Sequence, residues 1–337
     1  MIKFIKKLIL SIFILILFIF ILEYLLSLYL PQIKTYPLEE NSFGKYPSVY
    51  SDYLPFTLPK NMIFNHSREE FNVTYVTNSF GYLNKKMKTL EKYKKRILFL
   101  GDSFTLGWGN NYEQSFVGLI ETNFNDLEII NAAYHAGYSP DSYYAFLINE
   151  GIKLKPDTII VVIYSGNDVE DLKSTIWTKI DANNYPLSID TTREYSDYKG
   201  NLIKSKWNYE TPILGRSRLF IGFTNLIDKK IRQQKEVSYD KAYNKFKISV
   251  HGINNFSEIN NIKLIFLIIP KKPKKCDEFC LNEHKKIKEF IINLNKTTID
   301  MKDILKDEHY YEKDGHLNNY GNNIVFNSIK NINLLLN

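Results

Sequence analysis

The sequence predicts an α/β protein with a doubly wound parallel sheet, preceded by an N-terminal transmembrane helix. Two observations predict this architecture. The first thirty residues are almost entirely apolar, and a stretch of that length can cross a bilayer. From residue 96 onward, short runs that are apolar on both faces alternate with segments of helical periodicity. That alternation is typical of parallel strands covered by helices on both sides.

Residues 1–30 have the features of a membrane anchor. Three lysines precede the apolar run: Lys3, Lys6 and Lys7. Charges in this position favour a cytoplasmic N-terminus. At about 1.5 Å per residue, a helix over residues 8–30 could cross a hydrocarbon core about 30 Å thick, with Glu23 near the far interface. No A-x-A-like cleavage pattern ends the run, which favours an uncleaved anchor over a cleaved signal peptide or a soluble core helix. Either of the first two cases places the rest of the chain in the periplasm or at the cell surface.

The composition is that of an ordinary globular protein. Of the 337 residues, 44% are hydrophobic and 24% charged, enough to bury a sizeable core. The net charge of +7 is mild and spread along the chain. It is compatible with acidic glycans or lipid headgroups. Without an Arg-rich cluster or a nucleic-acid motif, it indicates no DNA or RNA partner.

Two cysteines stand close together in "KKCDEFCLNE", at Cys276 and Cys280. An extracytoplasmic compartment would permit a disulfide, and the short separation makes one geometrically possible. Free thiols are the alternative. Two thiols without a nearby histidine pair are a poor metal site, so no metal is expected.

The chain divides into the anchor, an extracytoplasmic connector over residues 31–95, and an α/β domain over 96–337. In the connector, Phe71, Val73 and Tyr75 alternate with polar residues, which predicts a strand of a hairpin covering the main domain. Within the domain, residues 170–239 show no clean period. A stretch of this length is usually a functional lid or a loop-rich subdomain.

The α/β domain has the expected alternation. Strands are predicted at 97–100, 127–130, 158–164 and 263–269, with a weaker one at 297–299. Helices are predicted at about 113–124, 139–151, 240–259, 281–294 and 318–335. In the fourth of these helices, the apolar residues Leu281, Ile287, Phe290, Ile291 and Leu294 are expected to share one face.

Polar residues follow the strands, at the edge where open parallel sheets bind their ligands. They are Gly101-Asp102-Ser103 after the first strand, Gly137 after the second, Gly166-Asn167-Asp168 after the third, and Asp314 and His316 before the last helix. A serine at the start of a helix has its backbone N–H in the positive field of that helix. The backbone N–H groups of Ser103 and Gly137 and the Asn167 amide could together stabilise a developing oxyanion.

His316 is the candidate base for Ser103, because imidazole titrates near neutral pH, and a carboxylate beside it would fix its tautomer. His135 and His309 are competing bases, and His309 is expected to be structural. Each motif also has a structural interpretation: Gly-Asp-Ser and Gly-Asn-Asp are common in turns and helix caps. The joint placement of all the motifs at strand ends favours the catalytic interpretation.

Together, "GDSFTLGWG", Gly137 after "NAAYHA", "GND" at 166–168 and "DGHLNNYG" resemble the four blocks of the SGNH (GDSL-type) hydrolase superfamily. The resemblance covers about residues 96–335, and "TNSFGYL" upstream resembles membrane-anchored bacterial members. It implies a flavodoxin-like fold, a Ser103 nucleophile, an oxyanion hole completed by Gly137 and Asn167, His316 as base, and no metal or cofactor. Asp102 and Asp168 are expected to support the site.

The last block departs from the usual pattern. The superfamily usually has Asp three residues before its His, where this sequence has Lys313, and Asp314 stands two residues before. Because the D-x-H spacing resembles SGNH-like polysaccharide O-acetyltransferases, Asp314 is the expected orienting carboxylate.

The resemblance implies an extracytoplasmic serine ester hydrolase acting on an acylated glycan or lipid. Two alternatives remain open at this point: an O-acyltransferase that uses the same acyl-enzyme, and a catalytically idle glycan-binding or scaffold protein.

Overall fold

The computed structural model describes residues 2–29, 48–49, 51–84, 89–134, 137–191, 195–196, 202–203, 216–233 and 237–331. Its centre is a five-stranded parallel sheet, as predicted. The strands are β3 (Lys95–Leu100), β4 (Leu127–Asn131), β5 (Thr158–Tyr164), β10 (Lys263–Ile269) and β11 (Thr297–Asp300). Their order across the sheet is β11-β10-β5-β3-β4, and every pairing is parallel. This is the doubly wound order of flavodoxin-like folds.

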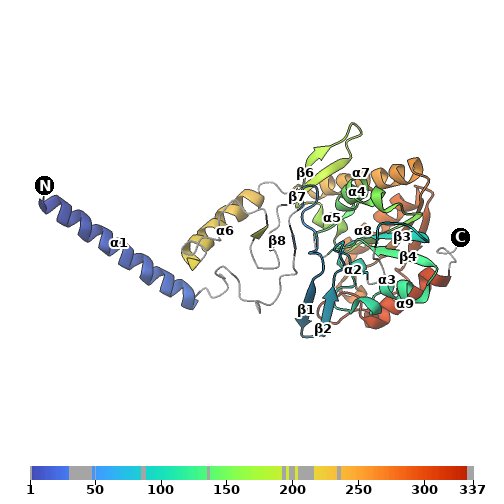
Figure 1. Ribbon diagram of the computed structural model, residues 1–337, viewed down its shortest axis with the longest axis horizontal. Helices are drawn as coiled ribbons and strands as arrows, with labels where there is room; N and C mark the ends of the chain where they lie inside the picture. The colour runs from blue at the N-terminus through green and yellow to red at the C-terminus, as the bar shows by residue number, and fades with distance from the viewer. Residues whose placement is uncertain are drawn as a thin grey trace.

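Helices cover both faces of the sheet. They are α2 (Ser103–Leu106), α3 (Phe116–Asn123), α4 (Pro140–Asn149), α5 (Asp168–Asp171), α7 (Tyr239–Ile259), α8 (Glu278–Ile292) and α9 (Asn319–Asn331). Short 3-10 turns lie at Tyr112–Gln114, Gly151–Leu154, Pro273–Lys275 and Asp307–His309. Helices α3 and α9 pack together on one face, while α4 and α7 pack together on the other (Figure 1).

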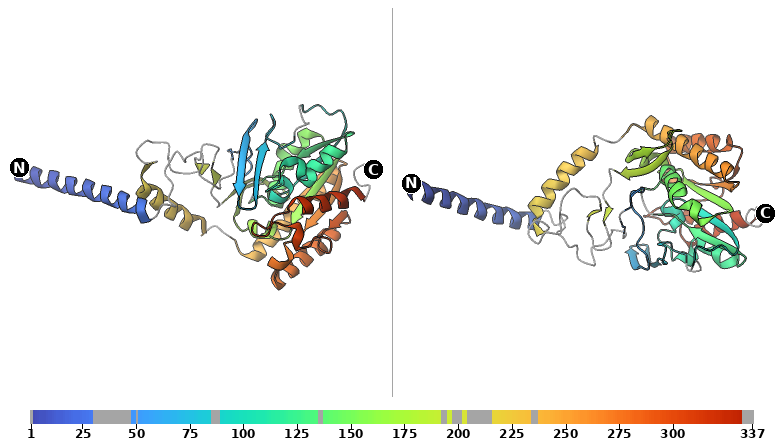
Figure 2. Two further views of the ribbon diagram at one scale, coloured as in Figure 1. Left: turned by 90° about the horizontal axis from the view of Figure 1, so that it is seen from below. Right: turned by 45° about the horizontal axis from the view of Figure 1, so that its top comes forward.

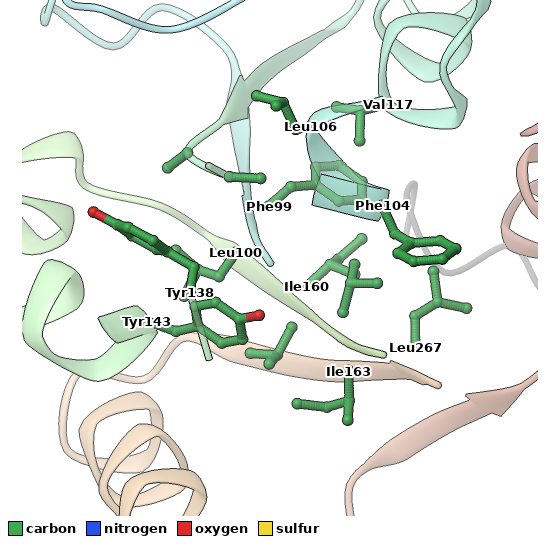
Figure 3. Close-up of a cluster of buried hydrophobic side chains, with 14 of the residues drawn as sticks. Phe99, Leu100, Phe104, Leu106, Val117, Tyr138, Tyr143, Ile160, Ile163 and Leu267 are labelled. Carbon is green, nitrogen blue, oxygen red and sulfur yellow. The ribbon is translucent and has the colours of Figure 1, made fainter. Parts of the chain in front are cut away.

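The strands form because their residues are apolar on both faces. In β10 every residue after Lys263 is buried, and β5 is buried up to its last residue, Tyr164. Figure 3 shows the resulting core, in which side chains of β3, β5 and β10 meet Phe104 of α2. The first turn of α2 is therefore fixed directly to the sheet.

Two antiparallel hairpins flank the domain. The first joins β1 (Ile63–Arg68) to β2 (Phe71–Val76), and alternate residues of β2 are buried, as the alternation in the sequence predicts. The second joins β6 (Thr175–Ile180) to β7 (Pro186–Thr191), which packs on α4. A short pair, β8 (Tyr195–Ser196) and β9 (Leu202–Ile203), follows.

Two helices lie outside the α/β domain. Helix α1 (Ile2–Tyr29) is long and apolar enough over Lys3–Tyr29 to cross a membrane, with a mean hydropathy of 2.9. Helix α6 (Arg218–Gln233) lies between α1 and the domain in all three views (Figures 1 and 2). The expected lid over 170–239 therefore includes a hairpin and a long helix. Neither element was predicted, because residues 170–239 show no clean period when taken together.

The prediction that the apolar residues of helix α8 share one buried face is wrong in part. Ile287 and Ile291 of α8 are fully buried, but Leu281 is 45% exposed. Cys280 and His284 face the core instead. Cys280 also forms the predicted disulfide with Cys276, and the Cα atoms of the two residues lie 5.3 Å apart.

We expect substitution in β10 to be costly. Ile265→Ala removes a fully buried side chain from the middle of the sheet and should lower the free energy of unfolding by about 2–5 kcal/mol. Urea unfolding of the full chain in detergent measures this. Ile259→Ala is the matched control, because that side chain is 81% exposed, and it should change the free energy by less than about 0.5 kcal/mol. Equal effects would contradict the fold.

Candidate active site

The candidate site lies where the winding of the sheet reverses. Strands β3 and β5 are adjacent, although β4 comes between them in the chain. Ser103 begins α2 just after β3, and Asn167 caps α5 just after β5. Such a switch point is where open α/β sheets place their ligands.

Three of the predicted residues form a hydrogen-bonded series. Ser103 Oγ lies 2.8 Å from His316 Nε2, and His316 Nδ1 lies 2.5 Å from Asp314 Oδ1. Ser103 is 213 residues from His316 in sequence, so only the fold brings them together. This is the geometry of a nucleophile, a general base and an orienting carboxylate.

The sequence around Ser103 explains its position. A Cβ at Gly101 would meet Thr105 Oγ1 at 2.0 Å, so only glycine lets α2 turn this closely over the end of β3. Asp102 is the N-cap, and its side chain accepts a hydrogen bond from the backbone N–H of Phe104 at 3.0 Å. Ser103 thereby becomes the first residue of the helix.

The loop that carries His316 is closed on itself by its own backbone. The N–H of Tyr311 donates to the carbonyl of His316 at 2.8 Å, and Tyr310 forms an antiparallel bridge with Leu317. Gly315, with φ of +89°, adopts the left-handed conformation that the turn requires.

Two distant segments hold this loop from outside. Glu70, in the turn between β1 and β2, accepts hydrogen bonds from the backbone N–H groups of Lys313 and Asp314, at 3.0 and 2.7 Å. The buried ammonium of Lys272 donates to the carbonyls of Tyr311 and Glu312, at 3.3 and 3.2 Å. The sequence analysis missed Glu70 and Lys272, because no local pattern links them to the loop.

The Asp314 carboxylate is held in its charged form. Burial favours a higher pKa for Asp314, but the hydrogen bond and charge interaction with His316 outweigh it and lower that pKa. Trp108 Nε1 donates to the second oxygen, Oδ2, at 3.4 Å. Asp314 can therefore stabilise an imidazolium on His316.

Two of the predicted oxyanion donors bind Asp171, a residue that was not predicted. The backbone N–H of Gly137 donates to Asp171 Oδ2 at 3.3 Å, and Asn167 Nδ2 donates to the same oxygen at 3.1 Å. The single hydrogen of Gly137 thus points at a carboxylate in this structure. The Asn167 amide has a second hydrogen. Asp171 follows Asn167 by four residues, a helical spacing that could have revealed it.

The supporting residues Asp102 and Asp168 are fully buried beneath the site. Burial raises the pKa of Asp102, and the nearby charge of Asp171 adds to the shift. Burial also raises the pKa of Asp168, followed by the charges of Asp102 and Asp171. Asp168 accepts hydrogen bonds from the Tyr164 N–H and the Tyr143 hydroxyl, at 3.1 and 3.2 Å. Both residues brace the turns that carry Ser103 and Asn167.

Aromatic rings flank the imidazole of His316. Phe104 lies 4.7 Å from it between ring centroids and stacks on Tyr164 at 3.8 Å. Trp108 lies 5.7 Å away and packs against His66 of β1 at 4.3 Å. These rings give the site an apolar wall.

The competing histidines do not replace His316 in the described structure. His309 Nδ1 accepts a hydrogen bond from the backbone N–H of Lys306 at 2.8 Å, a capping role. His135 lies outside the described residues.

A separate cleft of about 850 Å³ lies between the connector and α4. Its lining includes the aromatic residues Tyr53, Phe80, Tyr82, Tyr134 and Phe146, but neither Ser103 nor His316. We place the site at the serine because the cleft holds no nucleophile paired with a base.

Comparison with known proteins gives distant structural likenesses only. No family model matches the sequence, and no curated protein does. A Desulfitobacterium hafniense protein described as lipolytic and of the G-D-S-L family is 12% identical, with 71% of this chain and 99% of that chain covered and a TM-score of 0.42.

Two other solved structures are similarly distant. A psychrotrophic esterase from Pseudoalteromonas sp. is 11% identical, with 71% and 96% covered and a TM-score of 0.43. An acetyl xylan esterase from Geobacillus stearothermophilus is 13% identical, with 73% and 98% covered and a TM-score of 0.43.

We expect Asp314→Asn to lower kcat for an ester substrate by roughly 10³- to 10⁴-fold, because the amide cannot stabilise the imidazolium of His316. Asp303→Asn is the control and should retain activity, because Asp303 is an exposed carboxylate between β11 and the 3-10 turn at Asp307–His309. Steady-state kinetics with an aryl ester measures both. Full activity in Asp314→Asn would exclude that carboxylate as the orienting group.

We also expect acid to loosen the contact between β1 and the site. Burial, followed by the charge of Arg68, lowers the pKa of His66 from 6.5 to about 4. The unfolded chain therefore binds the extra proton first, and stability present above about pH 6.5 is lost as the pH falls toward 4.

His66→Phe should make the fall in Tm between pH 7 and 4 shallower than in the unaltered protein, with His251→Phe, at an exposed histidine, as the control. Thermal unfolding followed by circular dichroism measures it. If Tm falls as steeply with pH in His66→Phe as in the unaltered protein, His66 is not the group responsible for the loss of stability in acid.

Proposed function

We propose that this protein is an extracytoplasmic serine ester hydrolase of the SGNH type. The observation that carries the proposal is the 2.8 Å contact between Ser103 Oγ and His316 Nε2, with Asp314 behind the imidazole. A serine at the start of a helix, hydrogen-bonded to an oriented imidazole, is the arrangement that acyl transfer requires.

The first half of the reaction forms the acyl-enzyme. Ser103 Oγ attacks the ester carbonyl carbon while His316 Nε2 takes the hydroxyl proton. The bond between the carbonyl carbon and the alcohol oxygen then breaks, and His316 returns the proton to the leaving alcohol. Water attacks the acyl group in the second half, again through His316, which releases the acid and restores Ser103.

Negative charge develops on the carbonyl oxygen in both halves. The Ser103 N–H, at the start of α2, and the second hydrogen of the Asn167 amide are the donors we assign to it. Each such donor contributes about 3–4 kcal/mol to transition-state stabilisation. The Gly137 N–H joins them only when it leaves Asp171, which it contacts at 3.3 Å.

The proposed location follows from α1, whose apolar span and N-terminal lysines favour a single-pass anchor with a cytoplasmic N-terminus. The substrate class we propose is an acylated glycan or lipid of the envelope. Transfer of the acyl group to a sugar hydroxyl instead of water is the second candidate, because Asp314 stands at the D-x-H spacing that resembles the O-acetyltransferases.

Ser103→Ala should abolish release of the alcohol from a short-chain aryl ester, a fall of roughly 10⁵- to 10⁶-fold. Ser328→Ala, at a serine of α9 that bonds its own helix, is the matched control and should retain activity. Mass spectrometry after an organophosphonate probe should place the adduct on Ser103.

Equal activity in Ser103→Ala, or an adduct elsewhere, would refute Ser103 as the nucleophile. No hydrolysis and no adduct in the unaltered protein would instead favour an idle binding fold. Supplying an acyl donor together with a polysaccharide separates the two reactions. Acyl groups that appear on the polysaccharide indicate transfer, and free acid indicates hydrolysis.

A further inference from the structure

Helix α6 carries an apolar stripe that is half-buried at Leu219 and that the described residues otherwise leave uncovered. Leu219, Phe223 and Leu226 follow a spacing of four and three residues, so they lie along one side of the helix. Phe223 is 61% exposed and Leu226 is 69% exposed. Large apolar side chains grouped in this way mark a contact surface.

The opposite side of α6 is occupied. Ile221 is 2% exposed and Thr224 is fully buried. Helix α6 contacts α1, and the half-buried residues near the end of α1 are Leu22, Glu23, Leu26 and Ser27. The exposed stripe is therefore a second apolar surface, separate from the one that packs inward.

A carboxylate joins the start of α6 to α1. Glu23 Oε2 accepts a hydrogen bond from the Arg218 N–H at 2.9 Å, and Oε1 accepts one from the Leu219 N–H at 3.2 Å. The Ser217 hydroxyl also donates to Glu23. These bonds satisfy backbone groups that a helix start otherwise leaves without partners, and they fix the beginning of α6 at the level of Glu23.

The level of Glu23 corresponds to a membrane boundary. Glu23 follows Lys3 by twenty residues and Lys7 by sixteen, which at 1.5 Å per residue is about 24–30 Å along the helix. The hydrocarbon core is about 30 Å thick. With the lysines at the inner surface, Glu23 and the start of α6 therefore lie at the outer edge of the core.

We propose that α6 is a second membrane-contacting element, which lies in the outer headgroup region with Leu219, Phe223 and Leu226 turned into the acyl chains. Amphipathic helices of this kind sit with their apolar face about 5–10 Å into that boundary. Figure 1 and the right view of Figure 2 show α6 turning away from the direction of α1, as an interfacial helix would.

This arrangement would hold the α/β domain at a fixed height. Helix α6 is followed by α7, which packs on the central sheet. With α1 and α6 both in contact with lipid, the domain has two attachments to the bilayer. The inference rests on the proposed anchor but not on the chemistry of Ser103.

Spin labels on the full-length chain in phosphatidylcholine–phosphatidylglycerol vesicles test it. The two native cysteines are paired, so Leu226→Cys introduces a single free thiol. Electron paramagnetic resonance compares collisions of the label with oxygen, which enters lipid, and with a water-soluble nickel chelate. Leu15→Cys in α1 and Ile259→Cys in α7 are the lipid and water references, at 57% and 81% exposure.

We expect the oxygen-to-nickel accessibility ratio at Leu226→Cys to be several-fold above that at Ile259→Cys and close to that at Leu15→Cys. Phe223→Cys repeats the test if the first variant folds poorly. A water-like ratio at both α6 positions, or dipolar broadening that shows α6 packed on a second copy, would overturn the proposal.

The measurements distinguish failure of the α6 proposal from failure of the anchor and from failure of the proposed chemistry. A water-like ratio at Leu15→Cys as well would overturn the anchor together with the role of α6. Hydrolysis of the aryl ester by the same labelled samples reports independently on Ser103, so loss of lipid contact and loss of catalysis cannot be confused.

Discussion

The parallel pairing of β3 with β5 is the constraint on which the candidate site depends. Leu100 lies opposite Val161, so the two strands end at the same edge of the sheet. Ser103 follows one strand and Asn167 the other, and neither could be displaced without breaking the register of two strands that are buried over almost their whole length. If one strand slipped by one residue, its side chains would also turn to the opposite face of the sheet. The position of Ser103 is thus determined by core packing rather than by loop conformation.

The site is assembled at a cost in stability. Asp102 and Asp168 are fully buried and close to Asp171, and burial and mutual repulsion raise the pKa values of both. Such carboxylates weaken the folded state as the pH rises above their usual values, because the unfolded chain releases their protons more easily. Each nevertheless accepts a hydrogen bond from a backbone N–H at a strand end, Asp102 from Phe104 and Asp168 from Tyr164. The same groups that destabilise the protein hold the turns of the site in place.

Much of this site could be predicted from local sequence, and the reason is physical. Ser103 and Asn167 follow apolar runs directly, so strand periodicity alone places them at one edge. His316 was a candidate base from its place before the last helix, and the resemblance to known blocks made Asp314 the expected orienting carboxylate. Lys272 and Glu70 could not be predicted. Lys272 binds backbone groups about 40 residues away, and Glu70 binds backbone groups more than 240 residues away. The amphipathic pattern of α6 was present in the sequence, but it was masked by the aperiodic residues around it.

The hairpin of β1 and β2 contacts the loop that carries His316. In the chain it follows α1 and comes before the α/β domain, and its turn binds the loop of His316 through Glu70. His66 on the same hairpin packs on Trp108, which in turn donates to Asp314. The connector is therefore part of the site as well as a tether. Because an oriented imidazole needs a rigid loop, a domain beginning at residue 96 would contain Ser103 and His316 but would lack the Glu70 carboxylate that holds the loop of His316.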